Sequence, residues 1–257
     1  MYQDAPSSFD KNGFYLATGL LDSQTCLILE KEFDKIIDQI KKSGEDINAR
    51  WNSELINNIE EVGSSVLHTH NVQSYSHKML EMIQDERLMD VTESLIGSDI
   101  ILHHTKLFLK PPKKGASFPL HQDWSYFPTK NNSMIAAVVH LSDSHKNMGR
   151  IRVVKGSHKM ERIPGSDGHS FIKGIHDKHN LEASEPVDAN AGDVLFFHCC
   201  TLHGSNSNIS SKPRKTILIQ LYSGQDKIEE SEHTNLKLVL RGWNYQATRG
   251  NLDRIKG

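Results

Sequence analysis

The sequence has 257 residues, of which 37% are hydrophobic and 24% are charged, and its formal net charge is −2. This composition is typical of a soluble globular domain, and the near balance of charge excludes a general electrostatic attraction to nucleic acid or to a membrane surface. No apolar run approaches the about 18 residues that a membrane-spanning helix needs. We therefore expect one domain that has neither nucleic acid nor a membrane as a partner.

The cysteines and the first residues indicate the compartment. Cys26, Cys199 and Cys200 do not form the pattern of a disulfide framework, so we expect all three to be reduced. The N-terminus lacks a basic segment followed by an apolar run, which argues against a signal peptide. Both features favour a cytoplasmic protein. The 15 histidines favour an imidazole and carboxylate site over a thiolate site, if a metal is bound.

Residues 1–98 are expected to be mainly helical. In chain order, the apolar pattern predicts a strand at 14–18, a helix at 23–42, an irregular segment at 45–72 and a helix at 73–96. Asp22 offers an N-cap for the first helix, and Gly44 follows as its stop. Gly97 ends the second helix, which is expected to break near Gln84.

From Asp99 the pattern changes to short strands. The expected strands are 100–110, 120–126, 134–141, 151–154, 194–200 and 215–222. Helices followed by many short strands indicate a mainly β fold, with antiparallel sheets that helices brace on one side. Residues 155–191 are poor in apolar residues, and a loop of this length is often a functional lid.

His121 and Asp123 lie two residues apart in an expected strand, so their side chains should share one face. His203 follows the apolar strand at 194–200. Two histidines and one carboxylate on one face of an octahedron leave three positions open, as in non-haem ferrous oxygenases. The alternative is a strand histidine beside a solvated aspartate, with His203 in a structural role.

Arg214 favours the metal site over the structural alternative, because it opens a strand eleven residues after His203. A guanidinium group is a bidentate partner for a carboxylate. A keto-acid co-substrate needs one end chelated to iron and its other carboxylate held by a cation. The combined set therefore indicates an iron site that also binds a keto acid.

These motifs resemble those of the phytanoyl-CoA dioxygenase family of iron(II)- and 2-oxoglutarate-dependent oxygenases, which includes ectoine hydroxylases. The resemblance covers residues 9–222, and its motifs are His121-Gln122-Asp123, Gly156-Ser157-His158-Lys159, residues 191–198, His203-Gly204-Ser205 with Asn206 and Asn208, and Arg214. It implies a double-stranded β-helix, which is a cupin-like jelly roll. The single domain, residues 1–257, would then comprise a helical region at residues 1–98, a jelly-roll core at 99–225 and a C-terminal extension at 226–257.

The resemblance also implies site residues. The ligands of Fe(II) would be His121, Asp123 and His203, and 2-oxoglutarate and O2 would be co-substrates. Arg214 would pair with the distal carboxylate of 2-oxoglutarate, and Ser205 would hydrogen-bond the same group. Lys106 falls where the family often has a methionine that contacts the co-substrate. This lysine would add a second cation there or reach the substrate, unless it is a solvent-facing strand residue.

The reaction implied is hydroxylation of a small molecule, with release of succinate and CO2. Related halogenases have glycine or alanine at the position of Asp123, so the carboxylate favours hydroxylation, while desaturation and ring closure stay open. Two departures from the family, in strand 134–141 and in turn 144–150, affect the substrate pocket. The primary substrate and the oligomeric state are not indicated.

Four further residues are weaker candidates for substrate contacts. Trp124 and Tyr126 follow the metal motif and could line the pocket, and Gln220 shares the inward strand face with Arg214. Arg241 could reach over the pocket mouth to bind an anionic substrate. Ordinary packing or surface exposure is the alternative for each. For the whole chain, the alternatives are a catalytically silent relative that acts as a sensor or scaffold, and a zinc hydrolase.

Overall fold

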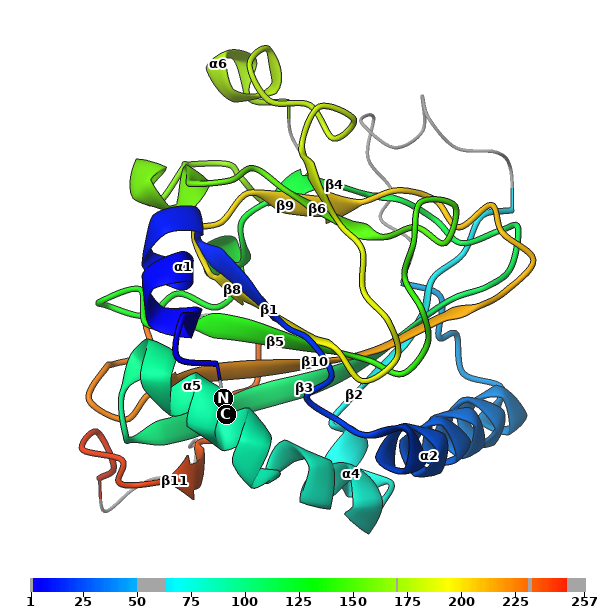
Figure 1. Cartoon of the computed structure of the whole chain (residues 1–257), viewed down its shortest axis with the longest axis horizontal. Coiled ribbons are helices and arrows are strands. Elements are labelled where there is room, and N and C mark those ends of the chain that lie inside the picture. Colours follow the sequence, from blue (N-terminus) through cyan, green and yellow to red (C-terminus); the bar gives the residue numbers. More distant parts are fainter. Residues whose placement is uncertain (1, 50–62, 170, 231–232, 249–257) are drawn as a thin grey trace, which may run out of the picture.

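The computed structural model describes residues 2–49, 63–169, 171–230 and 233–248. Within them, two antiparallel sheets face each other (Figure 1). The larger sheet has the order β1-β8-β5-β10-β3-β11, and β2 also pairs with β3. Its strands are β1 Phe14–Ala17, β2 Leu67–His70, β3 Ile100–Lys110, β5 Ile135–His140, β8 Val194–His198, β10 Arg214–Ser223 and β11 Leu238–Arg241. The smaller sheet contains, in spatial order, β4 Phe118–His121, β9 His203–Ser205, β6 Ile151–Val153 and β7 Glu185–Val187.

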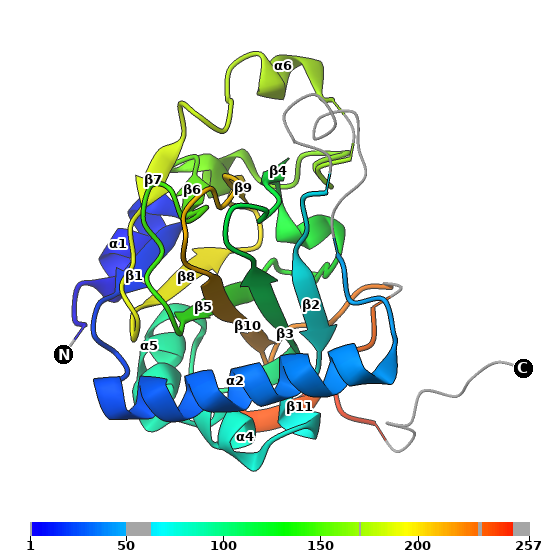
Figure 2. The same cartoon turned by 90° about the vertical axis from the view of Figure 1, so that its right-hand side faces the viewer.

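The helices pack mainly on the side of the larger sheet that faces away from the smaller one (Figures 1 and 2). The helices are α1 Ala5–Asn12, α2 Ser23–Ser43, α4 His77–Ile83 and α5 Glu86–Ile96, whereas the short α6 Lys173–His176 lies beyond the smaller sheet. The 3-10 turns are η1 Val72–Ser74, η2 Asp123–Ser125 and η3 Ser157–Met160. The mainly β fold with flanking helices that the sequence indicated is confirmed. No helix among the described residues is both long and apolar enough to cross a membrane.

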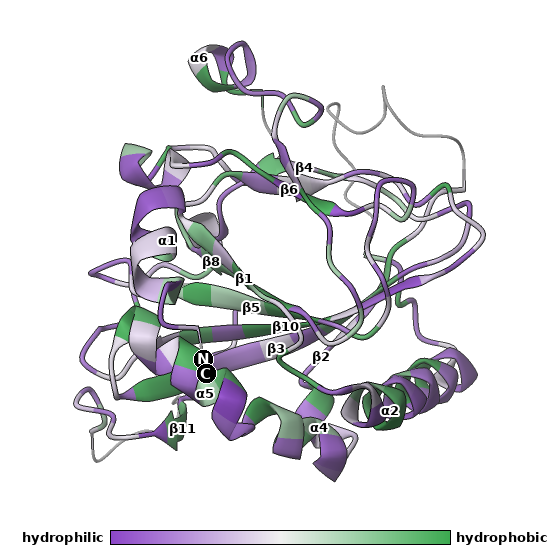
Figure 3. Cartoon of the chain, viewed as in Figure 1, coloured by the Kyte–Doolittle hydropathy of each residue, from purple (hydrophilic) through white to green (hydrophobic). Residues whose placement is uncertain are grey.

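Helix α2 shows why these residues form a covering helix. The Asp22 carboxylate accepts a hydrogen bond from the Thr25 backbone N–H at 2.8 Å, and Gly44 closes the helix with a φ of 78°. Its apolar residues recur at helical spacing and are buried, and they are Cys26, Leu29, Phe33, Ile36, Ile37 and Ile40. They join the main hydrophobic core, which lies between the helices and the outer face of the larger sheet. Polar and apolar residues accordingly alternate along α2, whereas β5 and β8 are mostly apolar (Figure 3).

Strand β10 separates the main core from the interior of the roll. Its odd-numbered residues Ile217, Ile219 and Leu221 are buried in the main core beneath the helices. The alternate residues Arg214, Thr216 and Leu218 line a cavity between the two sheets. This alternation follows from the two-residue period of a strand. It allows one strand to supply both an apolar outer face and a functional inner face.

Several elements differ from the sequence predictions. The expected strand 120–126 ends at His121, after which the chain forms the 3-10 turn η2. The segment 45–72, of which residues 50–62 lie outside the described residues, was predicted to be irregular but contains β2, whose histidines hide its strand pattern. Helix α1 was not predicted, although a proline stands in its first turn and Gly13 closes it. The predicted break near Gln84 separates α4 from α5. Residues 231–232 and 249–257 of the predicted C-terminal extension lie outside the described residues.

Candidate metal and co-substrate site

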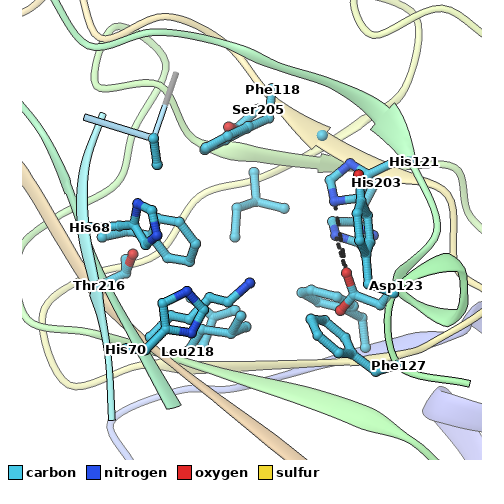
Figure 4. Close-up of a pocket in the computed structure, with 18 of the residues that line it drawn as sticks. His68, His70, Phe118, His121, Asp123, Phe127, His203, Ser205, Thr216 and Leu218 are labelled. Carbon is cyan, nitrogen blue, oxygen red and sulfur yellow. Dashed lines mark ion pairs between the residues drawn. The ribbon is translucent and has the colours of Figure 1, made fainter. Parts of the chain in front are cut away.

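Two histidines and one aspartate converge at one end of the cavity between the sheets (Figure 4). The Asp123 Oδ1 atom lies 3.8 Å from Nε2 of His121 and 3.6 Å from Nε2 of His203. All three residues are buried, and their candidate ligand atoms lie within 4.8 Å of one another. This spacing is compact enough for the three atoms to share one metal ion.

The pairing of β4 with β9 brings the two histidines together. His121 ends β4 and lies opposite His203, the first residue of β9, so that the ring centroids are 4.2 Å apart. Asp123 was predicted to lie in the same strand as His121, but this strand ends at His121. It opens η2, and its backbone carbonyl accepts hydrogen bonds from the N–H groups of Tyr126 and Phe127. A tight turn, rather than a shared strand face, therefore directs the carboxylate toward the histidines.

Hydrogen bonds orient both imidazoles for metal binding. Nδ1 of His121 lies 2.9 Å from the Pro119 carbonyl oxygen, and Nδ1 of His203 lies 2.9 Å from that of Thr201. A carbonyl can only accept, so each Nδ1 carries the hydrogen and each Nε2 presents a lone pair. Burial, followed by the proximity of His203, lowers the pKa of His121 to about 3, which keeps this imidazole neutral.

The second oxygen of Asp123 is held by an amide. Gln220 Nε2 donates a hydrogen bond to Asp123 Oδ2 at 2.6 Å, and both side chains are buried. Asp123 thus has one oxygen engaged and the other directed at the two imidazoles. Two histidines and a monodentate carboxylate match the ligand set of ferrous oxygenases, and these donors fit Fe(II).

Arg214 lies at the other end of the inner face of β10 and is buried without an anionic partner among the described residues. Its Nη1 donates to the Gly149 carbonyl oxygen, whereas its Nε has no hydrogen-bond partner in the same part of the chain. Burial lowers the pKa of this guanidinium to about 10. The residue lines the cavity, so its free edge is accessible to a bound molecule. A buried cation of this kind calls for an anion from outside the chain.

Ser205 is prepared to bind the same anion. Lys110, which is fully buried, donates from Nζ to Ser205 Oγ at 2.7 Å and to the Asn206 carbonyl oxygen at 2.7 Å. An ammonium group only donates, so the hydroxyl hydrogen of Ser205 remains available for another acceptor. Lys110 and Arg214 are paired across β3 and β10. The two strands therefore build a cationic end of the cavity that fits the distal carboxylate of 2-oxoglutarate.

The middle of the cavity carries a second cation and two further histidines. Lys106 lines the cavity, and its Nζ lies 5.1 Å from the centroid of the Phe127 ring. His68 and His70 come from β2 and lie across the cavity from the metal triad (Figure 4). The cavity has a volume of about 280 Å³, which is small for a ligand pocket.

The weaker candidates from the sequence have different positions. Tyr126 lines the cavity, whereas Trp124 packs beneath Arg162 and donates its indole N–H to Gln122. The expectation for Arg241 is corrected by its contacts, because its guanidinium forms ion pairs on α5 at the outer face of the larger sheet, with Glu86, Asp90 and Glu93. An arginine engaged there is unavailable at the pocket mouth.

Sequence reasoning missed the residues that support the triad. Gln122, the middle residue of the metal motif, donates to the carbonyl oxygens of Cys200 and Glu161, at 2.6 and 3.0 Å. Ser157 accepts a hydrogen bond from the Leu202 N–H at 2.8 Å, next to His203. The position of Gln122 between two inward residues was an available signal for an anchoring role. The roles of Lys110, His68 and His70 had no local signal, because they depend on pairing between distant strands.

Comparisons with known proteins agree with this geometry. A sequence model of the family described as phytanoyl-CoA dioxygenase (PhyH) matches residues 9–216. The chain is 28% identical over 156 residues to a probable alpha-ketoglutarate-dependent hypophosphite dioxygenase of Stutzerimonas stutzeri, covering 58% of this chain and 54% of that protein. It is 24% identical over 250 residues to an ectoine dioxygenase of Bordetella bronchiseptica, covering 90% of this chain and 78% of the relative. The chain thus spans about half the length of the first relative and most of the second.

Solved structures share the fold. The alpha ketoglutarate dependent epimerase SnoN from nogalamycin biosynthesis superposes with a TM-score of 0.73 at 19% identity, covering 90% of this chain and 86% of that chain. EctD from S. alaskensis with bound Fe superposes with a TM-score of 0.70 at 21% identity, covering 94% and 84% of the respective chains. The family match spans most of the sequence, and the chain therefore belongs to the phytanoyl-CoA dioxygenase family of iron(II)- and 2-oxoglutarate-dependent dioxygenases.

Proposed function

We propose that this enzyme hydroxylates an unactivated C–H bond of a small molecule and releases succinate and CO2. Its Fe(II) ligands would be His121, Asp123 and His203. The observation that carries the proposal is the pairing of this triad with Arg214, a buried guanidinium that has no acidic partner in the described chain, within one cavity. A keto acid chelated at the metal end and paired at the arginine end satisfies both sites.

The residues of the chain bind and orient the reactants. Arg214 pairs with the distal carboxylate of 2-oxoglutarate, and Ser205 donates its hydroxyl hydrogen to the same group because Lys110 occupies its acceptor side. Gln220 holds Asp123 so that one carboxylate oxygen is directed at the metal. The iron and 2-oxoglutarate supply the oxidising chemistry when they are bound, while the two sheets exclude water from the site.

Asp123 favours hydroxylation over halogenation, because its carboxylate takes the position that a halide would need. Its fixed hydrogen bond to Gln220 also argues against displacement of this ligand during turnover. The three free cysteines support a cytoplasmic location as part of the same proposal.

Two other functions predict different results. A silent relative would bind metal or ligand without turnover, and it has no need for both the triad and Arg214. A zinc hydrolase could use the three ligands, yet it would leave the buried guanidinium without a partner. A dioxygenase uses both the metal triad and the buried guanidinium, which favours it over these alternatives.

The test is succinate formation from 2-oxoglutarate with Fe(II) and oxygen present or withheld. Succinate that requires both supports the proposal, whereas tight metal binding without any turnover across a substrate library contradicts it. Asp123→Ala should abolish both Fe(II) binding and turnover. Asp177→Ala removes an exposed carboxylate and is the matched control. Full activity of Asp123→Ala would remove this residue from the ligand set.

A further inference from the structure

Lys106 is a cation inside the cavity that forms no ion pair with a carboxylate of the described residues. The residue lies on the inner face of β3, between His104 and Phe108, and its side chain lines the cavity. No carboxylate of the described residues lies within ion-pair distance of Nζ, which instead lies over the face of Phe127. Asp123 is the single acidic residue among the described residues that line the cavity, and it is engaged with the metal triad. Burial lowers the pKa of Lys106, and the attraction of Asp123 opposes this effect only in part. The ammonium group therefore needs an external anion.

The distal carboxylate of 2-oxoglutarate is not suited to be that anion. Lys106 is paired with Leu218, and Leu218 is four residues from Arg214 along β10. At about 3.3 Å per residue, the two rows are ~13 Å apart, so the two cations serve different groups. Lys106 lies closer to the metal end, because Gln220, the next inward residue of β10 after Leu218, is bonded to Asp123.

Charge balance leads to the same conclusion. Fe(II), Arg214 and the buried ammonium of Lys110 carry four positive charges, whereas Asp123 and the two carboxylates of 2-oxoglutarate carry three negative charges. These groups already have an excess of positive charge, and Lys106 adds to it. Because burying charge without a partner is unfavourable, an anion near Lys106 is favoured.

The surroundings of Lys106 can accept such a group. His68 and His70 lie two residues apart on β2, with ring centroids 5.2 Å apart, and His70 is paired with Lys106. Nδ1 of His68 is buried without a hydrogen-bond partner among the described residues. Burial, with a smaller effect of Lys106, lowers the pKa of each histidine to about 4, so both imidazoles are neutral near pH 7. A neutral imidazole carries one N–H that can donate to an oxyanion.

Much of the remaining wall is apolar. Phe108, Phe127, Val138 and Leu218 lie near Lys106, and His169 and His233 are further polar residues of the lining. This surface suits a hydrocarbon body, and the volume of about 280 Å³ limits its size.

We propose that the primary substrate is a small oxyanion with an apolar body, whose charged group binds Lys106 with His68 and His70. This inference rests on the proposed function and deepens it by naming the substrate class. Lys106 thereby determines specificity, and the charged group anchors the substrate so that its apolar body extends toward the metal triad.

The binding experiment uses the full chain loaded with Ni(II), which is inert in turnover, and with 2-oxoglutarate. The probes are C3 to C8 alkyl carboxylates and alkylphosphonates, tested against alkyl amides of the same length, with calorimetry as the readout. We expect anions to bind more tightly than amides. Lys106→Met keeps the side-chain length and should weaken anion binding about 10- to 100-fold, with the affinity for 2-oxoglutarate unchanged. Lys146→Met, at an exposed lysine, is the control.

Three results would overturn the inference. If amides bind as tightly as anions, the substrate does not need a negative charge. If Lys106→Met binds anions as tightly as the wild type, Lys106 does not bind the charged group. A loss of 2-oxoglutarate affinity in Lys106→Met, without loss of anion binding, would assign the lysine to the co-substrate. Failure of the proposed function is distinct, because the wild-type chain would then not bind 2-oxoglutarate at all. Retained 2-oxoglutarate binding also shows that the variant is folded.

Discussion

Gln220 is expected to control metal affinity without touching the metal. Its amide donates a 2.6 Å hydrogen bond to Asp123 Oδ2, and both side chains are buried. Gln220→Leu keeps a side chain of similar size on the same strand but removes this donor. Asp123 then has a buried oxygen that has lost its donor, and its carboxylate is free to rotate away from the histidines.

The size of the effect follows from the nature of the bond. A hydrogen bond to a charged group contributes about 1.5–3 kcal/mol, and every 1.4 kcal/mol is a factor of about ten in affinity. Because the bond orients a metal ligand, most of this loss should appear in metal binding. We therefore expect Fe(II) affinity to fall about 10- to 100-fold, the range that is typical of partners of metal ligands.

The assay is anaerobic competition for Fe(II) with a chelator, followed by succinate formation at saturating Fe(II). Gln225→Leu makes the same substitution at an exposed position and is the control. A Gln220→Leu chain with normal thermal unfolding and wild-type Fe(II) affinity would refute the reasoning. Recovery of most turnover at high Fe(II) would support orientation as the role of the amide.

Three further predictions concern the other end of the cavity and its pH dependence. Arg214→Ala should weaken 2-oxoglutarate binding by about 2–5 kcal/mol with Fe(II) still bound, and calorimetry that finds unchanged affinity would contradict the role of the guanidinium. Lys110→Met should also weaken 2-oxoglutarate binding, about tenfold, and adding Ser205→Ala should cost little more, because both changes remove one hydrogen-bonded unit; additive losses in this double-mutant cycle would argue against it. Burial, followed by Arg214, lowers the pKa of His140 to about 3 in the folded chain, against about 6.5 when unfolded. As the pH falls, His140 is protonated in the unfolded chain before it is protonated in the folded chain. The free energy of unfolding should therefore decrease between about pH 6.5 and pH 3, by up to about 1.4 kcal/mol per pH unit. In urea unfolding, His140→Gln should reduce this pH dependence, and an unchanged pH dependence would contradict the assignment.

The elements of the fold that the sequence predicted are those with strong local patterns. Strand β3 was predicted with its observed bounds, and α2 with its cap and stop, because alternation and helical spacing are visible within each segment. Strand β2 was missed because two of its four residues are histidines that line the cavity. Its extended conformation depends on pairing with β3, which is distant in the sequence.

The metal triad was predicted correctly as a group that converges, although one reason was wrong. His121 and Asp123 were expected to share a strand face, but the chain turns between them at Gln122, and the turn itself directs the carboxylate. The recurring motif identified the residues, whereas local geometry could not be inferred from a two-residue period. Arg241 was misplaced for a related reason, since the acidic face of α5 that holds it is contiguous only in the folded chain.

Two lysines of strand β3 show that the sequence can predict where a charged side chain points but not which groups it contacts. Lys106 and Lys110 are four residues apart, so alternation directs both toward the interior of the roll. Lys110 meets Ser205 and the Asn206 carbonyl there and becomes a member of the co-substrate site. Lys106 meets an aromatic face and two neutral histidines, which carry no negative charge, and the attraction of Asp123 offsets the effect of burial only in part. The same residue type on the same face thus has two roles, and the absence of an ion pair at Lys106 among the described residues is the reason to seek the substrate among anions.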